Sequence, residues 1–188
     1  MSVPNTPVTD ETPRVWIGCL HCYNAGYLVG EWFPARGADE VGLSDVHKGT
    51  GHLYPACEEL WCLDHEFIPV RHEFGPLEAA EWGRVFEEVG QEQWPAVCAW
   101  VESGDYVARG DSELPVIADF EERYCGHWDS FREYAEDLAD QTGLTAGWPD
   151  TAVDYFNYDA WTRDLRHDYV VVDAPDLDGH GVYVFRSL

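Results

Sequence analysis

Acidic side chains outnumber basic ones by more than three to one in this chain of 188 residues, with 36 Asp and Glu against 11 Lys and Arg, and the formal net charge is −25. A large excess of charges of one sign destabilises a compact state through self-repulsion. The sequence is nevertheless 45% hydrophobic and 14% aromatic, and it includes nine Trp. Disordered acidic chains lack such apolar content, so we expect this chain to fold.

The negative charge also restricts the partners that the chain can bind. It repels phosphate, so we expect neither direct binding to nucleic acid nor binding to an anionic membrane surface. No apolar run reaches about 18 residues, which predicts no membrane span. The first ten residues have neither the basic nor the apolar region of a secretory signal. We therefore expect a cytoplasmic protein whose six cysteines are reduced.

The acidity is distributed along the chain instead of being gathered in a tail. Residues 1–70 and residues 71–118 each carry −7, residues 119–178 carry −12, and the last ten residues carry +1. Solubility of a small domain requires a net charge of only about 2–8, so solubility alone does not explain the excess. Adaptation to high salt would produce a similar excess and stays open as an alternative.

The pattern of apolar residues predicts an α+β fold of three modules. Runs of β-branched and aromatic residues indicate strands, and apolar residues at helical spacing indicate helices. Residues 114–127 fit either a helix or a strand. Strands are expected at 14–20, 27–33, 60–67, 169–173 and 181–185, the last two as a hairpin with a Gly/Asp turn, and helices within 38–47 and at 77–89, 92–102, 130–142 and 158–165.

These elements group into successive parts of the chain. Residues 1–13 are polar and rich in Pro and are expected to form a flexible arm. A β-rich module at 14–72 is expected to hold an antiparallel three-stranded sheet and a short helix. A helical module at 73–114 follows, and a module of sheet and helices at 115–188 completes the chain.

The helix at residues 130–142 has the best-marked ends and an acidic face. Ser130 and Glu133 fit a capping box, and Gly143 suits the position that follows a helix. Its apolar stripe consists of Phe131, Tyr134, Ala135 and Leu138. Four carboxylates at i, i+3, i+4 and i+7 share one face: Glu133, Glu136, Asp137 and Asp140.

The spacing of these four carboxylates resembles that of a nucleic-acid backbone. Seven residues of helix rise about 10.5 Å, which gives one charge per about 3 Å, against ~3.4 Å between phosphates along one DNA strand. The net charge of the chain equals that of about 43 Å of duplex, or roughly a dozen base pairs. The pattern therefore favours a DNA mimic that occupies a basic groove, although a merely solvated helix face would carry the same residues.

Cysteine and histidine spacing raises the alternative of a small zinc-binding protein. Cys19-x2-Cys22 and Cys57-x4-Cys62 offer four thiols, and His21, His52 and His65 lie nearby in the sequence. Against this alternative, Cys19 falls in a predicted strand, where positions three apart point to opposite faces. We therefore expect no metal and no other cofactor.

The sequence does not predict an enzyme. No G-x-S-x-G, H-E-x-x-H or phosphate-loop pattern is present. The eight histidines are scattered along the chain, and paired carboxylates are too common in so acidic a sequence to indicate acid–base catalysis.

Several segments together resemble the ArdA antirestriction proteins. The stretch from Val15 to Phe33 includes Tyr-Asn-x-Gly-x-Leu-x-Gly-x-Trp, and the stretch from Glu59 to Phe67 is similar to the family's third strand. The acidic helix within 129–143 resembles the family's antirestriction motif, and residues 154–165 and 182–185 are also similar. The resemblance covers residues 14–186 and is weakest at 71–118.

This resemblance implies a non-catalytic inhibitor. Members of the family imitate bent B-form DNA and occupy the DNA-binding groove that the specificity and methyltransferase subunits of type I restriction–modification enzymes form. They are elongated homodimers, usually encoded on mobile genetic elements. The chain departs from the family pattern in residues 34–58, which are longer around His47 to Cys57, and the Cys/His cluster there is not part of that pattern.

We therefore expect a distributed binding surface of carboxylates. An acidic module for another basic protein partner stays open as an alternative function. The carboxylates expected to contact the partner are Glu133, Glu136, Asp137 and Asp140, the flanking Asp119, Glu121, Glu122 and Asp129, and Glu78, Glu81, Glu87 and Glu88 in the middle helix.

Overall fold

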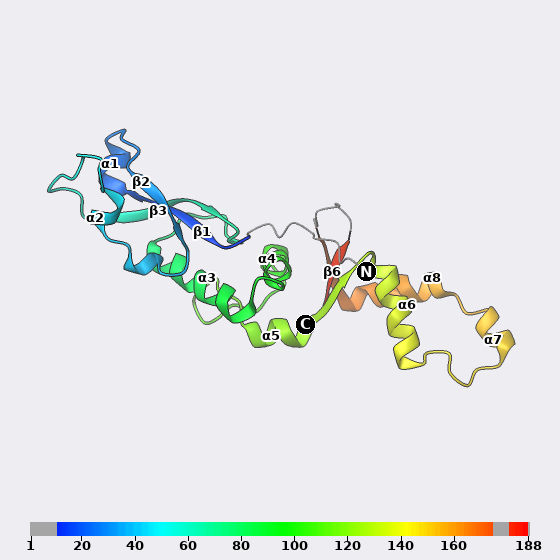
Figure 1. The fold of residues 1–188 in the computed structure, drawn as a ribbon. Helices are drawn as coiled ribbons and strands as arrows, with labels where there is room; N and C mark the ends of the chain where they lie inside the picture. The colour runs from blue at the N-terminus through cyan, green and yellow to red at the C-terminus, as the bar shows by residue number, and fades with distance from the viewer. Residues whose placement is uncertain (1–10, 175–180, 188) are drawn as a thin grey trace, which may run out of the picture. The chain divides into compact units, whose positions relative to one another are not determined.

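The structure is a computed structural model that describes residues 11–174 and 181–187 (Figure 1). The fold is α+β, as predicted. Contacts divide the chain into two compact units, Met1–Trp94 and Pro95–Leu188, and the boundaries of three modules stay a prediction. Residues 1–10 of the expected arm lie outside the described residues, whereas Pro13 is buried and its carbonyl accepts a hydrogen bond from the Ala35 N–H at 2.9 Å.

The first unit contains the predicted antiparallel sheet. Its strands are β1 (Arg14–Cys19), β2 (Gly30–Pro34) and β3 (Leu60–Glu66), in the order β2-β1-β3. Alternate residues of β1 enter the core, since Val15, Ile17 and Cys19 are fully buried. The strand ends one residue earlier than expected because the chain turns directly into a short helix, α1 (Leu20–Asn24), which the sequence pattern did not indicate.

The indole of Trp16 lies across two glycines of this sheet. A Cβ built on Gly30 would lie 2.4 Å from the Trp16 ring, and one built on Gly18 would lie 2.6 Å from it. Neither contact is sterically possible, so any side chain at either position would displace the indole. The two glycines are therefore packing residues.

Helix α3 (Pro76–Val89) packs against the sheet and begins at a proline, which suits the first helical turn. Trp82 and Val85 are buried as predicted, whereas Leu77, expected on the same apolar stripe, is 64% exposed. Gly83 permits close packing, because a Cβ there would lie 2.3 Å from the backbone nitrogen of Arg36. Trp94 is also buried in this core, and its indole N–H donates to the Phe67 carbonyl at 2.9 Å.

Between β2 and β3 the first unit has little regular structure. The expected short helix within 38–47 is present as a 3-10 turn, η1 (Ala38–Glu40), followed by α2 (Leu43–Val46). The chain then runs without regular secondary structure from residue 47 to residue 59. We refer to residues 47–59 as the long loop. Its only buried residues are His47 and Cys57.

The second unit contains a second antiparallel sheet, of order β4-β6-β5. Residues 114–127, which fitted either a helix or a strand, contain one of each. The hairpin of β5 and β6 forms as predicted, but its expected turn lies outside the described residues. The elements are α4 (Trp94–Ser103), α5 (Ile117–Arg123), β4 (Tyr124–Trp128), α6 (Phe131–Thr142), α7 (Asp150–Asp154), α8 (Tyr158–Leu165), η2 (Arg166–Asp168), β5 (Tyr169–Asp173) and β6 (Val182–Arg186).

Both faces of β6 are covered. Val184 joins a cluster with Phe131 and Tyr134 of α6, while the adjacent Phe185 stacks against Trp100 of α4 at 6.1 Å between ring centroids. Successive strand residues point to opposite faces, and both Val184 and Phe185 are fully buried. The sheet therefore anchors α6 on one side and α4 with α5 on the other.

Arg123, at the end of α5, is a buried cation in the second unit. Its guanidinium donates to the carboxylate of Asp105, to the Asp105 carbonyl at 2.9 Å and to the Arg186 carbonyl at 2.6 Å. It also lies over the Trp100 ring, 5.6 Å from the centroid. These contacts satisfy the charge inside the core.

Candidate functional site

Helix α6 begins and ends where the sequence predicted. The Ser130 hydroxyl accepts a hydrogen bond from the Glu133 N–H at 3.2 Å. The Glu133 carboxylate accepts from the Asp129 N–H at 3.0 Å, one residue before the position of a standard capping box. Gly143 adopts the left-handed conformation, with φ 62°, that terminates the helix.

The carboxylates of α6 lie opposite its buried side. Phe131, Tyr134, Ala135 and Ala139 face the core. Burial raises the pKa of Tyr134, and the hydroxyl of Tyr169 adds to this rise. The opposite side is the acidic face, which we define as Glu133, Glu136, Asp137 and Asp140; three of its members are exposed and Asp137 is half-buried.

Arg132 borders the acidic face and links two helices. It contacts Glu136 at 2.8 Å within α6 and Asp159 of α8 at 3.0 Å. The hydrogen bond to Glu136 and the charge of Asp159 raise the pKa of Arg132. Helix α8 itself starts as predicted, with the Asn157 side chain accepting from the Ala160 N–H at 3.0 Å.

An open hollow of about 320 Å³ adjoins the acidic face. Asp137 accepts a hydrogen bond from the Gln141 side chain at 2.6 Å. Among the described residues, the Asp140 carboxylate has no hydrogen-bonding or ion-pair partner. Anionic groups therefore predominate at this surface, and the cation Arg132 lies beside them. The hollow is lined by Arg132, Glu136, Asp140 and Tyr158.

The flanking carboxylates differ in their surroundings. Glu121, Glu122 and Asp129 are exposed. Asp119 is half-buried, and one of its oxygens lies 3.4 Å from the guanidinium of Arg123. Asp119 is therefore engaged with the buried Arg123, whereas the other three are open to a partner.

The carboxylates of α3 belong to the first unit. Glu87 and Glu88 are exposed, while Glu78 and Glu81 are half-buried. Glu87 forms an ion pair with Arg36 at 2.6 Å, and Glu78 contacts the imidazole of His72 at 3.1 Å. Glu78 and Glu87 are therefore engaged within their own unit.

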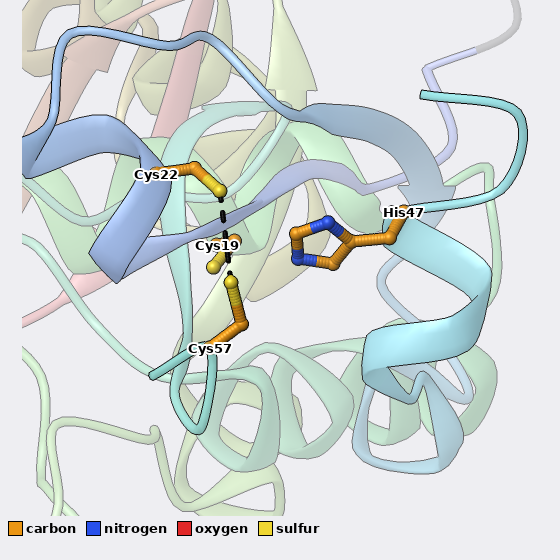
Figure 2. Close-up of side chains that lie close together, drawn as sticks. All are labelled: Cys19, Cys22, His47 and Cys57. Atoms are coloured by element: carbon orange, nitrogen blue, oxygen red, sulfur yellow. Dashed lines mark hydrogen bonds between the residues drawn. The ribbon is translucent and has the colours of Figure 1, made fainter. Parts of the chain in front are cut away.

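The cysteines considered as metal ligands are only partly brought together. The sulfur atoms of Cys19, Cys22 and Cys57 and a nitrogen of His47 all lie within 4.8 Å of one another (Figure 2). We call these four residues the Cys3His cluster. Cys62 lies outside it, and burial together with the charge of Glu78 raises its pKa to about 12.

The argument that placed Cys19 and Cys22 on opposite faces of one strand was wrong. The strand ends at Cys19, and Cys22 lies in the following helix α1. Burial is the main cause that raises the pKa of Cys22 to about 12, and the hydrogen bond with the Cys57 thiol adds to this rise. For Cys57, burial acts in the same direction but is outweighed by hydrogen bonds from the Tyr54 N–H and the other two thiols, which lower its pKa.

Sequence reasoning also missed His47. The histidines predicted as possible zinc ligands were His21, His52 and His65, which are closer in sequence to the cysteines. Instead, the His52 ring stacks on Tyr27 at 4.9 Å, and the His65 ring packs against Phe74 at 5.3 Å. His47 is 25 residues from the preceding cysteine of the cluster, Cys22, and no local motif marks it.

Comparison with known families identifies the chain. The profile of the family described as antirestriction protein (ArdA) matches residues 15–175. The chain belongs to the ArdA family. Comparison with curated proteins finds no match.

The ArdA match includes β1 at its start and β5 near its end, and α6 lies within it. It stops before β6, so residues 182–185, which also appeared similar to the family, lie outside the matched range. In the part of the chain that the structure describes, no helix is both long and apolar enough to cross a bilayer. Family membership gives this chain an antirestriction function directed at restriction–modification enzymes.

Proposed function

We propose that this ArdA protein inhibits type I restriction–modification enzymes without catalysis, by presenting carboxylates in place of DNA phosphates to the groove of the specificity and methyltransferase subunits. The observation that carries the proposal is the acidic face of α6. Family membership supports antirestriction as the activity. The acidic face gives that activity a physical mechanism, because a groove that binds polyphosphate attracts any array of anions with similar spacing.

The placement of the acidic face supports this mechanism. Phe131 and Tyr134 fix one side of α6 against β6, so the carboxylates project from a helix that is held in a packed core. A positioned array loses less conformational entropy on binding than a disordered acidic tail does. Glu121, Glu122 and Asp129 add three exposed carboxylates in the same unit.

Neutralising the acidic face tests the proposal. The variant E133Q/E136Q/D137N/D140N removes four charges from the surface of α6 and leaves its buried side unchanged. We expect a large loss of inhibition when a type I enzyme cleaves unmodified DNA. Because the charge of the chain is distributed, each single substitution is expected to have only a small effect.

The control is a variant with the same net charge and an intact acidic face. E31Q/E40Q/E102Q/D111N removes four exposed carboxylates that lie elsewhere. We expect this variant to inhibit nearly as well as the unaltered protein. Undiminished inhibition by both variants would contradict the role of the acidic face. An equal loss of inhibition in both would show that net charge alone accounts for the effect.

Competition distinguishes a DNA mimic from an acidic module for some other basic protein. A mimic and specific duplex DNA cannot occupy the same groove, so duplex DNA must displace the chain from the enzyme. Binding must also weaken steeply as salt rises, because the contacts are between charges. Simultaneous binding of DNA and the chain to the enzyme would exclude mimicry.

By the resemblance described above, we further propose that the chain acts in the cytoplasm as a homodimer and that residues 115–188 carry the dimer contact. A dimer doubles the number of carboxylates that a single inhibitor presents. Light scattering on the purified protein measures this directly: a monomer at the concentrations that inhibit the enzyme would contradict it.

A further inference from the structure

The Cys3His cluster has the residue types and the geometry of a metal centre. Cys19 ends β1, Cys22 lies in α1, and His47 and Cys57 stand at the start and near the end of the long loop. All four are buried. We propose that Cys19, Cys22, His47 and Cys57 bind one structural Zn²⁺ ion.

His47 supplies the observation that points to a ligand. Its side chain is only 5% exposed, and neither ring nitrogen has a hydrogen-bond partner among the described residues. Buried polar groups in proteins are almost always hydrogen-bonded, because an unpaired one costs free energy of desolvation. Figure 2 shows the imidazole directed at the three sulfur atoms, and a metal ion between them would satisfy one of its nitrogens.

The separation of the sulfur atoms fits tetrahedral coordination. Zn–S bonds of about 2.3 Å at the tetrahedral angle place two sulfurs roughly 3.8 Å apart. The sulfurs of Cys22 and Cys57 are 3.8 Å apart. A disulfide would require about 2.05 Å, and none of the six cysteines, all of which the structure describes, forms a disulfide. The spacing therefore corresponds to two ligands of one ion.

The long loop shows what such an ion would do for the fold. Of residues 48–59, only Cys57 is buried, so the loop has almost no apolar contact that could hold it in place. Loops of this length without secondary structure are uncommon in compact domains unless something fixes them. Coordination through His47 and Cys57 fixes both ends of the loop to β1 and α1, where the other two ligands lie.

The chemistry of the donor set selects zinc and a structural role. Three thiolates and one imidazole in tetrahedral arrangement are typical of structural zinc sites. With four protein ligands the coordination is complete, and no position stays open for water or substrate. The Tyr54 N–H, which donates to the Cys57 sulfur at 3.4 Å, is the kind of outer contact that orients a metal ligand.

Metal analysis of the full chain, purified without chelator and under reducing conditions, tests the proposal directly. We expect about one zinc per chain. After removal of the metal, titration with Co²⁺ should produce the visible absorption of a tetrahedral cobalt–thiolate site and saturate at one equivalent. Subsequent Zn²⁺ should abolish that absorption. These readouts do not depend on inhibition of a restriction enzyme, so they stand apart from the proposed function.

Two matched pairs of variants assign the ligands. H47Q should lose metal, whereas H52Q, in the same loop, should retain it because the His52 ring stacks on Tyr27 instead. C57S should lose metal, whereas C98S, outside the cluster, should retain it. If the ligand variants fail to fold, the Co²⁺ titration of the unaltered chain still decides.

Three results would overturn the proposal. The first is reduced protein with neither zinc nor a cobalt spectrum. The second is iron in place of zinc after growth with both metals. The third is unchanged metal content in H47Q.

Discussion

Asp140 offers a sharp test of how the acidic face affects stability. It lies in the last turn of α6, where the helix dipole disfavours an anion by about 0.3–1 kcal/mol. Glu136 and Asp137, four and three residues earlier, each add a like-charge repulsion of roughly 0.2–0.5 kcal/mol. Asp140→Asn removes all three terms, so the free energy of unfolding should rise by about 0.7–2 kcal/mol.

The same change at Glu133 serves as the matched control. Glu133 also has two like-charged neighbours, but it lies in the first turn, where the dipole favours an anion. The terms oppose each other, so Glu133→Gln should stay within about 0.5 kcal/mol of the unaltered protein. A gain at Glu133 equal to that at Asp140 would contradict the reasoning.

Urea unfolding and native-state hydrogen exchange of the α6 amides measure these changes, the first globally and the second locally. Both sites are exposed, so the gain in Asp140→Asn should decline as ionic strength rises from about 0.01 to 1 M and the screening length falls from about 30 to 3 Å. A loss of stability, or a gain that is indifferent to salt, would refute the electrostatic account.

Three further predictions concern stability. Arg123→Met should lower the free energy of unfolding by about 3 kcal/mol, because the charge-assisted hydrogen bonds to Asp105 and two carbonyls are lost. Urea unfolding measures this change, and a loss of stability under about 1 kcal/mol would contradict the prediction. In an ordinary helix interior, a Gly-to-Ala change stabilises the protein by about 1 kcal/mol. Gly83→Ala should instead lower the melting temperature, because its Cβ would clash with the backbone of Arg36. An unchanged or higher melting temperature would disprove the close packing. Burial lowers the pKa of His65 from 6.5, so stability should fall as pH drops below about 6.5.

The sign of the His65 effect follows from proton uptake. Above pH 6.5 the residue is neutral in both states and contributes nothing. Below it the unfolded chain binds a proton that the folded chain resists, which favours unfolding. His65→Gln should remove this part of the pH dependence in urea unfolding between pH 5 and 8, and an identical profile in both proteins would refute it.

Local sequence signals were sufficient for most of the fold. Helix α6 was predicted with both ends, because Ser130 and Gly143 are residues whose chemistry specifies a helix boundary. Ambiguity arose at residues 114–127, where a short helix passes directly into β4. A window long enough to detect a period averages over such a junction. Leu77 was misassigned because spacing alone does not say how far a neighbouring element extends.

The Cys3His cluster was predicted only in part, for a reason of topology. Cys19 and Cys22 are local and were considered together, but a strand was assumed to continue through them. His47 is brought to them by the return of the chain after α2. Proximity of residues 25 apart in sequence depends on the tertiary path, which spacing does not encode. The carboxylates of α6 were easier to place, because one helix alone sets their geometry.

The glycines beneath Trp16 bear on how this family is recognised. Gly30 belongs to the Tyr-Asn-x-Gly-x-Leu-x-Gly-x-Trp stretch, and it accommodates an indole within a sheet. Nothing in that contact involves a carboxylate. A chain can therefore preserve this signature while its surface charges are rearranged, and two relatives with the same scaffold can differ in the enzyme they oppose. Detecting the scaffold and inferring the target are separate problems, and the second must be solved from the exposed residues.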